Sequence, residues 1–136
     1  MALEWNDEYC TGVDKVDEQH RKLFALLNDL EEMITQGIDS GSKVDNLLTS
    51  LATDIQTHFS FEENCMMRYN CPVARENKEA HNQFLSNFGS FQHEYKAKGS
   101  SASLLKNLHT TAESWMVSHI CHIDIHLKSC VRKESN

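Results

Sequence analysis

Two features of the sequence predict an all-α protein, folded as an antiparallel up-down four-helix bundle with an irregular N-terminal arm. Residues that interrupt helices are few and lie in short breaks: Pro72 is the only proline, and Gly37, Gly41 and Gly99 fall in two loop-like segments. The short alternating runs of β-branched residues that indicate strands do not occur. With 136 residues, the chain is long enough for one domain with a buried core.

The bounds of the expected elements follow from caps and from apolar periodicity. Asp17 is a suitable N-cap for the first helix, and Ser42 and Asp45 resemble a capping box at the start of the second. Pro72 occupies the favoured first turn of the third helix. We therefore expect an arm of residues 1–16, followed by helices at about 17–37, 42–67, 72–98 and 103–128.

Composition excludes several classes of partner. The formal net charge is −7, whereas a surface that binds nucleic acid or an anionic membrane needs clustered lysine and arginine. No apolar run approaches the roughly 20 residues of a membrane span, and the N-terminal residues lack the basic and hydrophobic regions of a secretory signal. We therefore expect a cytoplasmic protein without nucleic-acid binding or membrane insertion.

The cysteines indicate the redox state of the chain. They are five in number, an odd count, and none forms a CxxC pair: Cys10, Cys65, Cys71, Cys121 and Cys130. This pattern favours reduced thiols over a disulfide framework. It also gives no indication of a zinc site built from thiolates.

Ionisable side chains occupy core positions of the expected helices. The inward positions of the second helix, spaced alternately by four and three residues, are Val44, Leu48, Leu51, Ile55, His58, Glu62 and Cys65. Similar spacing places Asn77 and His81 inward on the third helix, His119 on the fourth and His20 on the first. Because neighbouring helices run antiparallel, we expect these polar residues to gather at one end of the bundle.

Such a group of polar side chains predicts a metal site. Imidazoles and carboxylates in a bundle interior each cost several kcal/mol in desolvation unless something pairs them, and a metal cation does so. Imidazole and carboxylate without thiolate suit iron or manganese, with carboxylates able to bridge two ions, and zinc is compatible with the same ligand types. The sequence shows no Ser/His/Asp arrangement, phosphate loop or dinucleotide-binding motif that would indicate other chemistry.

The segment SHICHIDIH, residues 118–126, leaves the choice of ligands near the C-terminus open. On an ideal helix His119, His122 and His126 share one face, whereas Asp124 points roughly 140° away from His119. Periodicity alone therefore favours three histidines.

The sequence also resembles a bacterial hemerythrin domain over nearly its whole length. The resemblance rests on GVDKVDEQHRKLF around His20, HFSFEENCM with His58 and Glu62, NKEAH with His81, and WMVSHICHID with Trp115, His119 and Asp124. In that family two iron ions are joined by an oxo or hydroxo group and two carboxylates, and O2 or small anions bind at an open position. The resemblance thus implies a non-haem di-iron cofactor.

The resemblance also assigns roles to single residues. It implies that Glu62 and Asp124 bridge the irons, that His20 and His58 hold one iron, and that His81 and His119 hold the other. It marks Leu23, Phe59, Trp115 and Ile120 as the apolar lining of an O2 pocket, a set that ordinary core packing explains equally well.

By this resemblance, Asp124 is a ligand and His122 and His126 are not. A π-bulge after His119 would permit this arrangement, because it shifts the inward register to Ile120, Asp124 and Leu127. The two remaining histidines would then point outward and titrate as exposed groups.

Asn77 departs from the family pattern. Hemerythrin domains usually carry a His-x3-His pair on this helix, and here Asn77 stands four residues before His81. Asn77 can coordinate weakly through its amide oxygen, hydrogen-bond a water, or be a bystander. Loss of one imidazole should loosen the metal and leave an exchangeable position on both ions.

Three functions are compatible with this site. The first is an O2- or redox-sensing domain whose change in helix position regulates a fused output, such as a chemotaxis or diguanylate cyclase module. The final residues HLKSCVRKESN suggest it, because they contain no evident helix stop and are consistent with a linker. The second is a stand-alone O2 carrier, and the third a di-iron oxidase or peroxide-handling enzyme; we expect the domain itself not to be an enzyme, because no acid-base pair stands beside the ligands.

Overall fold

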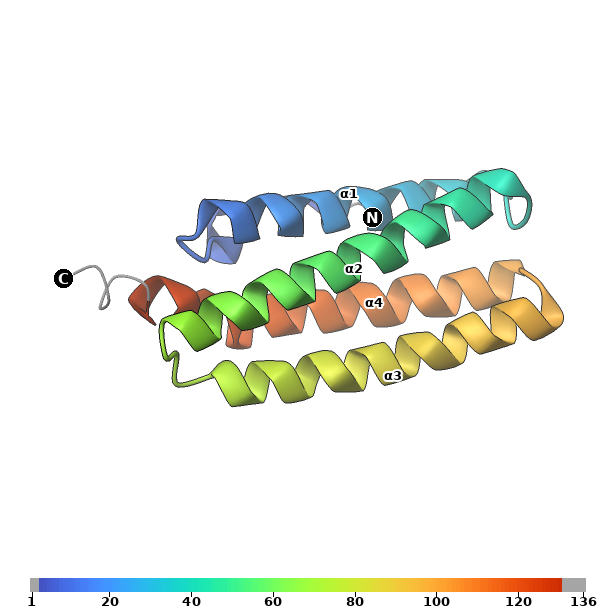
Figure 1. Ribbon diagram of the computed structural model, residues 1–136. Coiled ribbons are helices and arrows are strands. Elements are labelled where there is room, and N and C mark those ends of the chain that lie inside the picture. The colour runs from blue at the N-terminus through green and yellow to red at the C-terminus, as the bar shows by residue number, and fades with distance from the viewer. Residues whose placement is uncertain (1–2, 131–136) are drawn as a thin grey trace.

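The computed structural model describes residues 3–130 and confirms the all-α four-helix bundle (Figure 1). The helices are α1 (Asp14–Thr35), α2 (Ser42–Arg68), α3 (Ala74–Lys98) and α4 (Ala102–His122), with short 3-10 helices η1 (Asp7–Tyr9) and η2 (Asp124–His126). Within residues 3–130 there is no strand, and no helix is both long and apolar enough to cross a membrane. Consecutive helices run antiparallel, so α1 and α3 begin at the end where α2 and α4 finish.

The arm is tied back onto α1 by polar contacts. Its residue Leu3 exchanges two backbone-to-side-chain hydrogen bonds with Asn28, at 2.8 and 2.9 Å. Asp17 is not the N-cap that the sequence predicted: α1 begins at Asp14 behind Val13, and no side chain caps it. The buried carboxylate of Asp17 instead accepts hydrogen bonds from the amide and the hydroxyl of Thr11, each at 2.8 Å.

The capping box predicted for α2 is also wrong. The helix begins at Ser42 as expected, but its N-cap is Gly41, at φ 100°, and no side chain caps it. The carboxylate of Asp45 accepts a hydrogen bond from the hydroxyl of Tyr95, near the end of α3, instead. This contact links α2 to α3 at the end of the bundle away from the polar cluster.

The third and fourth helices differ from expectation at their ends. Pro72 lies in the connection before α3, which begins two residues later at Ala74. At α4, the side chain of Ser101 caps the first turn by accepting from the amide of Leu104. This helix ends at His122, earlier than predicted, and the chain continues through η2 into a helical turn at 127–130.

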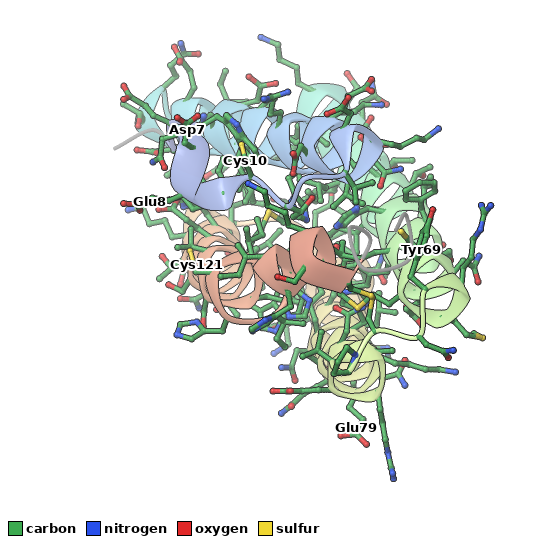
Figure 2. All side chains as sticks on the ribbon, turned by 90° about the vertical axis from the view of Figure 1, so that its left-hand side faces the viewer. Asp7, Glu8, Cys10, Tyr69, Glu79 and Cys121 are labelled. Atoms are coloured by element: carbon green, nitrogen blue, oxygen red, sulfur yellow. A yellow bond between two sulfur atoms is a disulfide. The ribbon has the colours of Figure 1, made fainter. Side chains whose placement is uncertain are left out.

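Two apolar clusters fill the bundle. The larger runs along its length and includes Leu27, Leu30, Leu51, Ile55, Phe84, Phe88, Leu105 and Leu108. The smaller closes the end where α2 and α4 finish and consists of Val16, Met66, Cys71, Ile123, Leu127 and Cys130. Seen from that end, residues 124–130, here called the C-terminal segment, lie across the bundle (Figure 2). Polar residues that are buried between these clusters are therefore shielded from water on both sides.

The expectation of reduced thiols is wrong for two of the five cysteines. Cys71, in the connection between α2 and α3, forms a disulfide with Cys130 in the C-terminal segment. The two residues are 59 positions apart, and the fold brings their Cα atoms to 5.5 Å, within the normal range for a bridge. Residue counts and CxxC spacing carry no information about such a long-range approach. Cys10, Cys65 and Cys121 are free and half-buried.

The contact between Thr11 and Asp17 yields a prediction about stability. Thr11→Val keeps the shape of the side chain but removes one of the two hydrogen bonds to the buried carboxylate of Asp17. We therefore expect the free energy of unfolding to fall by about 1 to 3 kcal/mol. Urea denaturation measures this change. Thr49→Val is the matched control, because Thr49 is exposed on α2 and its hydroxyl only bonds the carbonyl of Asp45. Equal losses in the two variants would contradict a structural role for Thr11.

Candidate metal centre

Seven polar side chains meet between the two apolar clusters. They come from every helix of the bundle: His20 from α1, His58 and Glu62 from α2, Asn77 and His81 from α3, His119 from α4 and Asp124 from η2. None is more than 5% exposed. The structure thus brings together the six residues that the resemblance marks as ligands, with Asn77 beside them.

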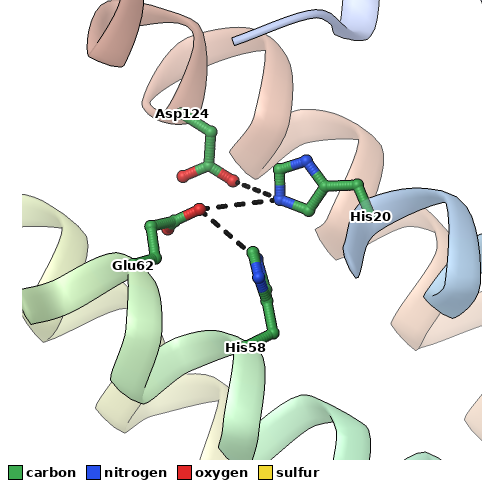
Figure 3. A group of neighbouring side chains, drawn as sticks. All are labelled: His20, His58, Glu62 and Asp124. Atoms are coloured by element: carbon green, nitrogen blue, oxygen red, sulfur yellow. Dashed lines mark ion pairs between the residues drawn. The ribbon is translucent and has the colours of Figure 1, made fainter. Parts of the chain in front are cut away.

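Half of this cluster lies between α1 and α2 (Figure 3). The Nε2 atom of His20 is 3.1 Å from Oδ2 of Asp124 and 3.6 Å from Oε2 of Glu62. The Nε2 atom of His58, one turn before Glu62, is 3.3 Å from the same Oε2 atom. Two imidazole nitrogens therefore face one oxygen from each carboxylate.

The other half repeats the arrangement between α3 and α4. The Nε2 atom of His81 is 3.2 Å from Oε1 of Glu62, and that of His119 is 3.2 Å from Oδ1 of Asp124. The two Nε2 atoms are 3.1 Å apart. Each carboxylate thus turns one oxygen toward each histidine pair, which is the arrangement of a carboxylate that bridges two ions.

Asp124 reaches the cluster because α4 breaks before it. The helix ends at His122, Ile123 adopts φ −121° and ψ −58°, and a 3-10 turn follows. The predicted π-bulge is therefore wrong. The helix instead ends before Asp124, and the break at Ile123 with the 3-10 turn after it turns this carboxylate toward the cluster. Asp124 is fully buried, as are Ile120 and Leu127.

The two other histidines of this segment are not part of the cluster. His122 and His126 are exposed, and Nδ1 of His122 lies 2.8 Å from the carbonyl oxygen of Ser118 one turn earlier. Strict helical periodicity, which favoured them, fails because the helix does not continue through the segment.

Asn77 stands beside the pair formed by His81 and His119. Its Oδ1 atom is 2.8 Å from Nε2 of His119, and its side chain is fully buried. The Nδ2 atom has no hydrogen-bond partner among the described residues. Asn77 therefore occupies the edge of the cluster with one unsatisfied amide donor, which costs free energy in a dry interior unless another group accepts from it.

Two contacts that the sequence analysis missed orient the histidines from outside. Nδ1 of His58 lies 2.7 Å from Oε1 of Gln19, and Nδ1 of His81 lies 3.1 Å from Oε2 of Glu63. Such outer hydrogen bonds fix the ring so that Nε2 points inward, and they raise the basicity of a ligating imidazole. The only signal in the sequence is that each partner stands directly beside a residue of the cluster.

Aromatic side chains wall the cluster. Phe59 stacks on the ring of His81 with centroids 3.8 Å apart, and Trp115 stacks on His119 at 4.4 Å. A small cavity next to His20, His58, His119 and Asp124 is lined by the four expected residues, Leu23, Phe59, Trp115 and Ile120, together with Met116, which was not expected. An apolar space therefore adjoins the polar cluster.

Burial and ion pairing shift the pKa values of the cluster. Burial lowers the pKa of His20 and of His119, but the facing carboxylates of Asp124 and Glu62 outweigh it and raise each pKa to about 9. For Glu62, burial acts to raise the pKa, and the four surrounding histidines bring it well below its usual value. Desolvation lowers the pKa of His58. Without metal, protons on His20 and His119 thus balance the two carboxylates near neutral pH.

The residues present fit a pair of metal ions. Both nitrogens of His20 and all four carboxylate oxygens of Glu62 and Asp124 are buried without a well-directed hydrogen bond. The nitrogen and oxygen atoms that could bind metal form two groups, and in each group all atoms lie within 4.8 Å of one another. Both groups contain Glu62 and Asp124. Imidazole nitrogens and carboxylate oxygens without a thiolate suit iron or manganese.

Comparison with known proteins agrees with this geometry. The family model described as Hemerythrin HHE cation binding domain matches residues 11–130. Bacteriohemerythrin of Stenotrophomonas maltophilia is 25% identical over 118 residues, covering 87% of this chain and 74% of that protein, and bacteriohemerythrin of Pseudomonas aeruginosa (strain LESB58) is 25% identical over 130 residues, covering 96% and 82%. A crystal structure of wild-type hemerythrin shares the fold, with a TM-score of 0.80 at 21% identity, covering 96% of this chain and 98% of that one. The chain belongs to the hemerythrin family of di-iron-binding domains.

Proposed function

We propose that this chain is a cytoplasmic di-iron domain that senses O2 or redox state by binding O2 or small anions. His20 and His58 would hold one iron and His81 and His119 the other, while Glu62 and Asp124 would be shared between the two ions, with an oxo or hydroxo group completing the centre. The division of both carboxylates between two histidine pairs supports this assignment. A bound iron pair supplies ligand binding coupled to electron transfer.

Asn77 is the residue that favours sensing over storage. Its Oδ1 atom lies 2.8 Å from Nε2 of His119, at a position where the family usually has another histidine. An amide oxygen is a weaker donor to iron than imidazole, so exchangeable ligands have access to this half of the site as well. The unpaired Nδ2 atom gives such a ligand, or a water, a hydrogen-bond donor.

The apolar cavity supports binding of a small ligand. Leu23, Phe59, Trp115, Met116 and Ile120 enclose it beside the histidines. These side chains offer no acid or base, so the cavity favours binding over further chemistry and keeps bulk water from the site. This is the main argument against the alternative of a di-iron oxidase or peroxide-handling enzyme.

In a sensor the change at the site must reach a partner. Asp124 belongs to a short 3-10 turn between α4 and the helical turn at 127–130, so a change in its position moves the C-terminal segment. We propose that this segment leads to a fused signalling output, such as a chemotaxis or diguanylate cyclase module. The residues 131–136 that would connect to it lie outside the described part of the chain.

Metal content tests the assignment directly. Anaerobic loading with Fe(II) should give two irons per chain, and subsequent air and azide should produce the visible charge-transfer absorption of an oxo-bridged iron pair. Glu62→Ala should lower the content below one iron per chain, because it removes an oxygen from each histidine pair. Glu79→Ala, which changes an exposed carboxylate on α3, is the control. Full loading of the Glu62 variant would contradict a bridging role.

Restoring the missing imidazole tests sensing against carriage. Asn77→His should slow oxidation of the iron-loaded protein in air, because a further strong donor closes an exchangeable position; the natural chain should oxidise within minutes. Asn64→His, the same change at an exposed position of α2, should leave the rate unchanged. The readout is the visible spectrum after exposure to air. Oxidation that takes hours in the natural chain would favour the alternative of a stand-alone O2 carrier.

The raised pKa values predict how the metal-free protein responds to pH. His20 and His119 have folded pKa values of about 9 against 6.5 when unfolded, so their contribution to stability is complete below pH 6.5 and is lost as pH rises through 9. Each pKa unit corresponds to about 1.4 kcal/mol, so the metal-free protein should lose several kcal/mol over this window. His20→Gln should make this loss of stability with pH smaller, whereas His122→Gln, at an exposed site, should leave it unchanged. The free energy of unfolding is measured by urea denaturation at several pH values.

A further inference from the structure

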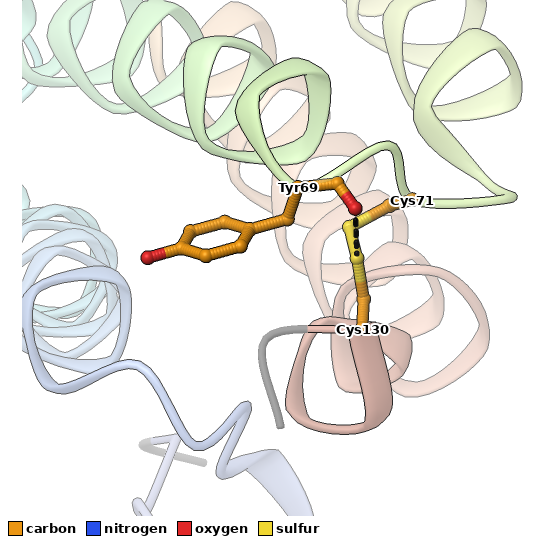
Figure 4. The surroundings of a disulfide bond; sticks show 3 residues. All are labelled: Tyr69, Cys71 and Cys130. Atoms are coloured by element: carbon orange, nitrogen blue, oxygen red, sulfur yellow. Dashed lines mark hydrogen bonds between the residues drawn. A yellow bond between two sulfur atoms is a disulfide. The ribbon is translucent and has the colours of Figure 1, made fainter. Parts of the chain in front are cut away.

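The Cys71–Cys130 disulfide lies next to Tyr69, where α2 ends (Figure 4). This is the end of the bundle that holds the candidate metal centre. Cys71 stands between the helix of Glu62 and the helix of His81, in the connection that joins α2 to α3. Cys130 follows Asp124 by six residues in the C-terminal segment, and its sulfur lies 3.4 Å from the carbonyl oxygen of Tyr69. The bridge therefore ties the C-terminal segment to the turn between two helices that contribute to the site.

The position of Asp124 depends on how this segment is held. Asp124 is not part of α4, and no side chain caps the 3-10 turn to which it belongs. Beyond it, Leu127 and Cys130 are buried in the smaller apolar cluster. On the other side the segment touches the arm, where a Cβ atom at Gly12 would come within 2.8 Å of Cγ of Lys128. Of these anchors, the disulfide is the only covalent one and the only one that a change of redox state removes.

We propose that Cys71 and Cys130 form a second redox site, a reversible disulfide clasp that sets how firmly Asp124 is held and hence how long the centre retains its metal. The inference rests on the proposed function, because it takes Asp124 as a shared ligand of both ions. In the cytoplasm, where thiols are kept reduced, a disulfide is more often regulatory or transient than structural. Its reaction partner is a dithiol reductant.

The step is thiol–disulfide exchange. A thiolate of the dithiol attacks one sulfur of the bridge, the sulfur–sulfur bond breaks, and a mixed disulfide forms. The second thiol of the reductant then displaces the remaining protein sulfur. The dithiol leaves as its disulfide, and Cys71 and Cys130 each take up a proton, so two electrons and two protons pass to the protein. The bridge is buried, since Cys71 is 6% exposed and Cys130 is 7% exposed. Attack therefore follows local opening of the C-terminal segment.

The first experiment tests the clasp without metal. Protein isolated in air and then denatured should react with three thiol-reagent equivalents, and five after reduction, since the chain has five cysteines. Amide hydrogen exchange of the metal-free protein should then be faster in residues 120–130 of the reduced form, with α1 unchanged. Five reactive thiols before reduction, or equal exchange in both forms, would overturn the proposal whatever the metal does.

The second experiment measures metal retention. Oxidised and reduced proteins, both loaded anaerobically with Fe(II) after removal of the reductant, are challenged with a chelator and the release of iron is followed. We expect release to be about tenfold faster from the reduced form, the scale seen when outer support of a ligand is lost. Cys71→Ser/Cys130→Ser should match the reduced natural chain. Cys10→Ser, which removes a free thiol, should match the oxidised one.

The outcomes separate the two proposals. If the chain binds no iron in either form while exchange in residues 120–130 still responds to reduction, the proposed function fails and the clasp on the segment stands. If iron binds as two ions per chain and leaves both forms at the same rate, the clasp fails as a control on the centre. Should the double variant not fold, the comparison of oxidised and reduced natural chain decides alone.

Discussion

The structure depends on how two buried carboxylates are compensated. Glu62 and Asp124 are fully buried, and an isolated charge in such a place costs many kcal/mol. Four imidazoles surround them, and in the metal-free protein protons on His20 and His119 supply the balancing charge. A pair of cations would supply the same charge without protons. We therefore expect metal binding and folding to be coupled at this end of the bundle.

This constraint explains why each helix contributes to the same place. The donors must converge on a volume of a few ångströms, and only the antiparallel order of the helices brings the starts of α1 and α3 to the ends of α2 and α4. The bundle cannot supply the last ligand from an intact helix, because Asp124 would then point away from His119. A break at Ile123 solves this, and its cost is offset by burial of Ile120 and Leu127 on either side.

The sequence predicted the bundle and the meeting of six of the seven polar residues because both follow from periodicity. Asp124, the seventh, was indicated only by the family resemblance. His58 and Glu62 stand on an apolar stripe of α2, and that pattern requires no knowledge of distant contacts. Features that depend on tertiary contacts were not accessible. The capping roles of Asp17 and Ser42 failed because Thr11 competes for the first carboxylate and Gly41 precedes the second helix. The Cys71–Cys130 bridge likewise joins residues 59 positions apart. The 3-10 turn at Asp124–His126 has no signal in helical periodicity.

The two halves of the cluster are supported alike from outside but differ at Asn77. His58 and His81 are each fixed by an outer hydrogen bond, to Gln19 and Glu63, whereas Asn77 leaves an amide donor unpaired beside His119. Exchange of a small ligand requires one weakly bound coordination position, while the other ligands, held firmly by their outer hydrogen bonds, retain the metal. In the proposed centre, Asp124 is the one shared carboxylate that lies on a short turn rather than on a long helix. A displacement of Asp124 would therefore be passed directly to the C-terminal segment that follows it.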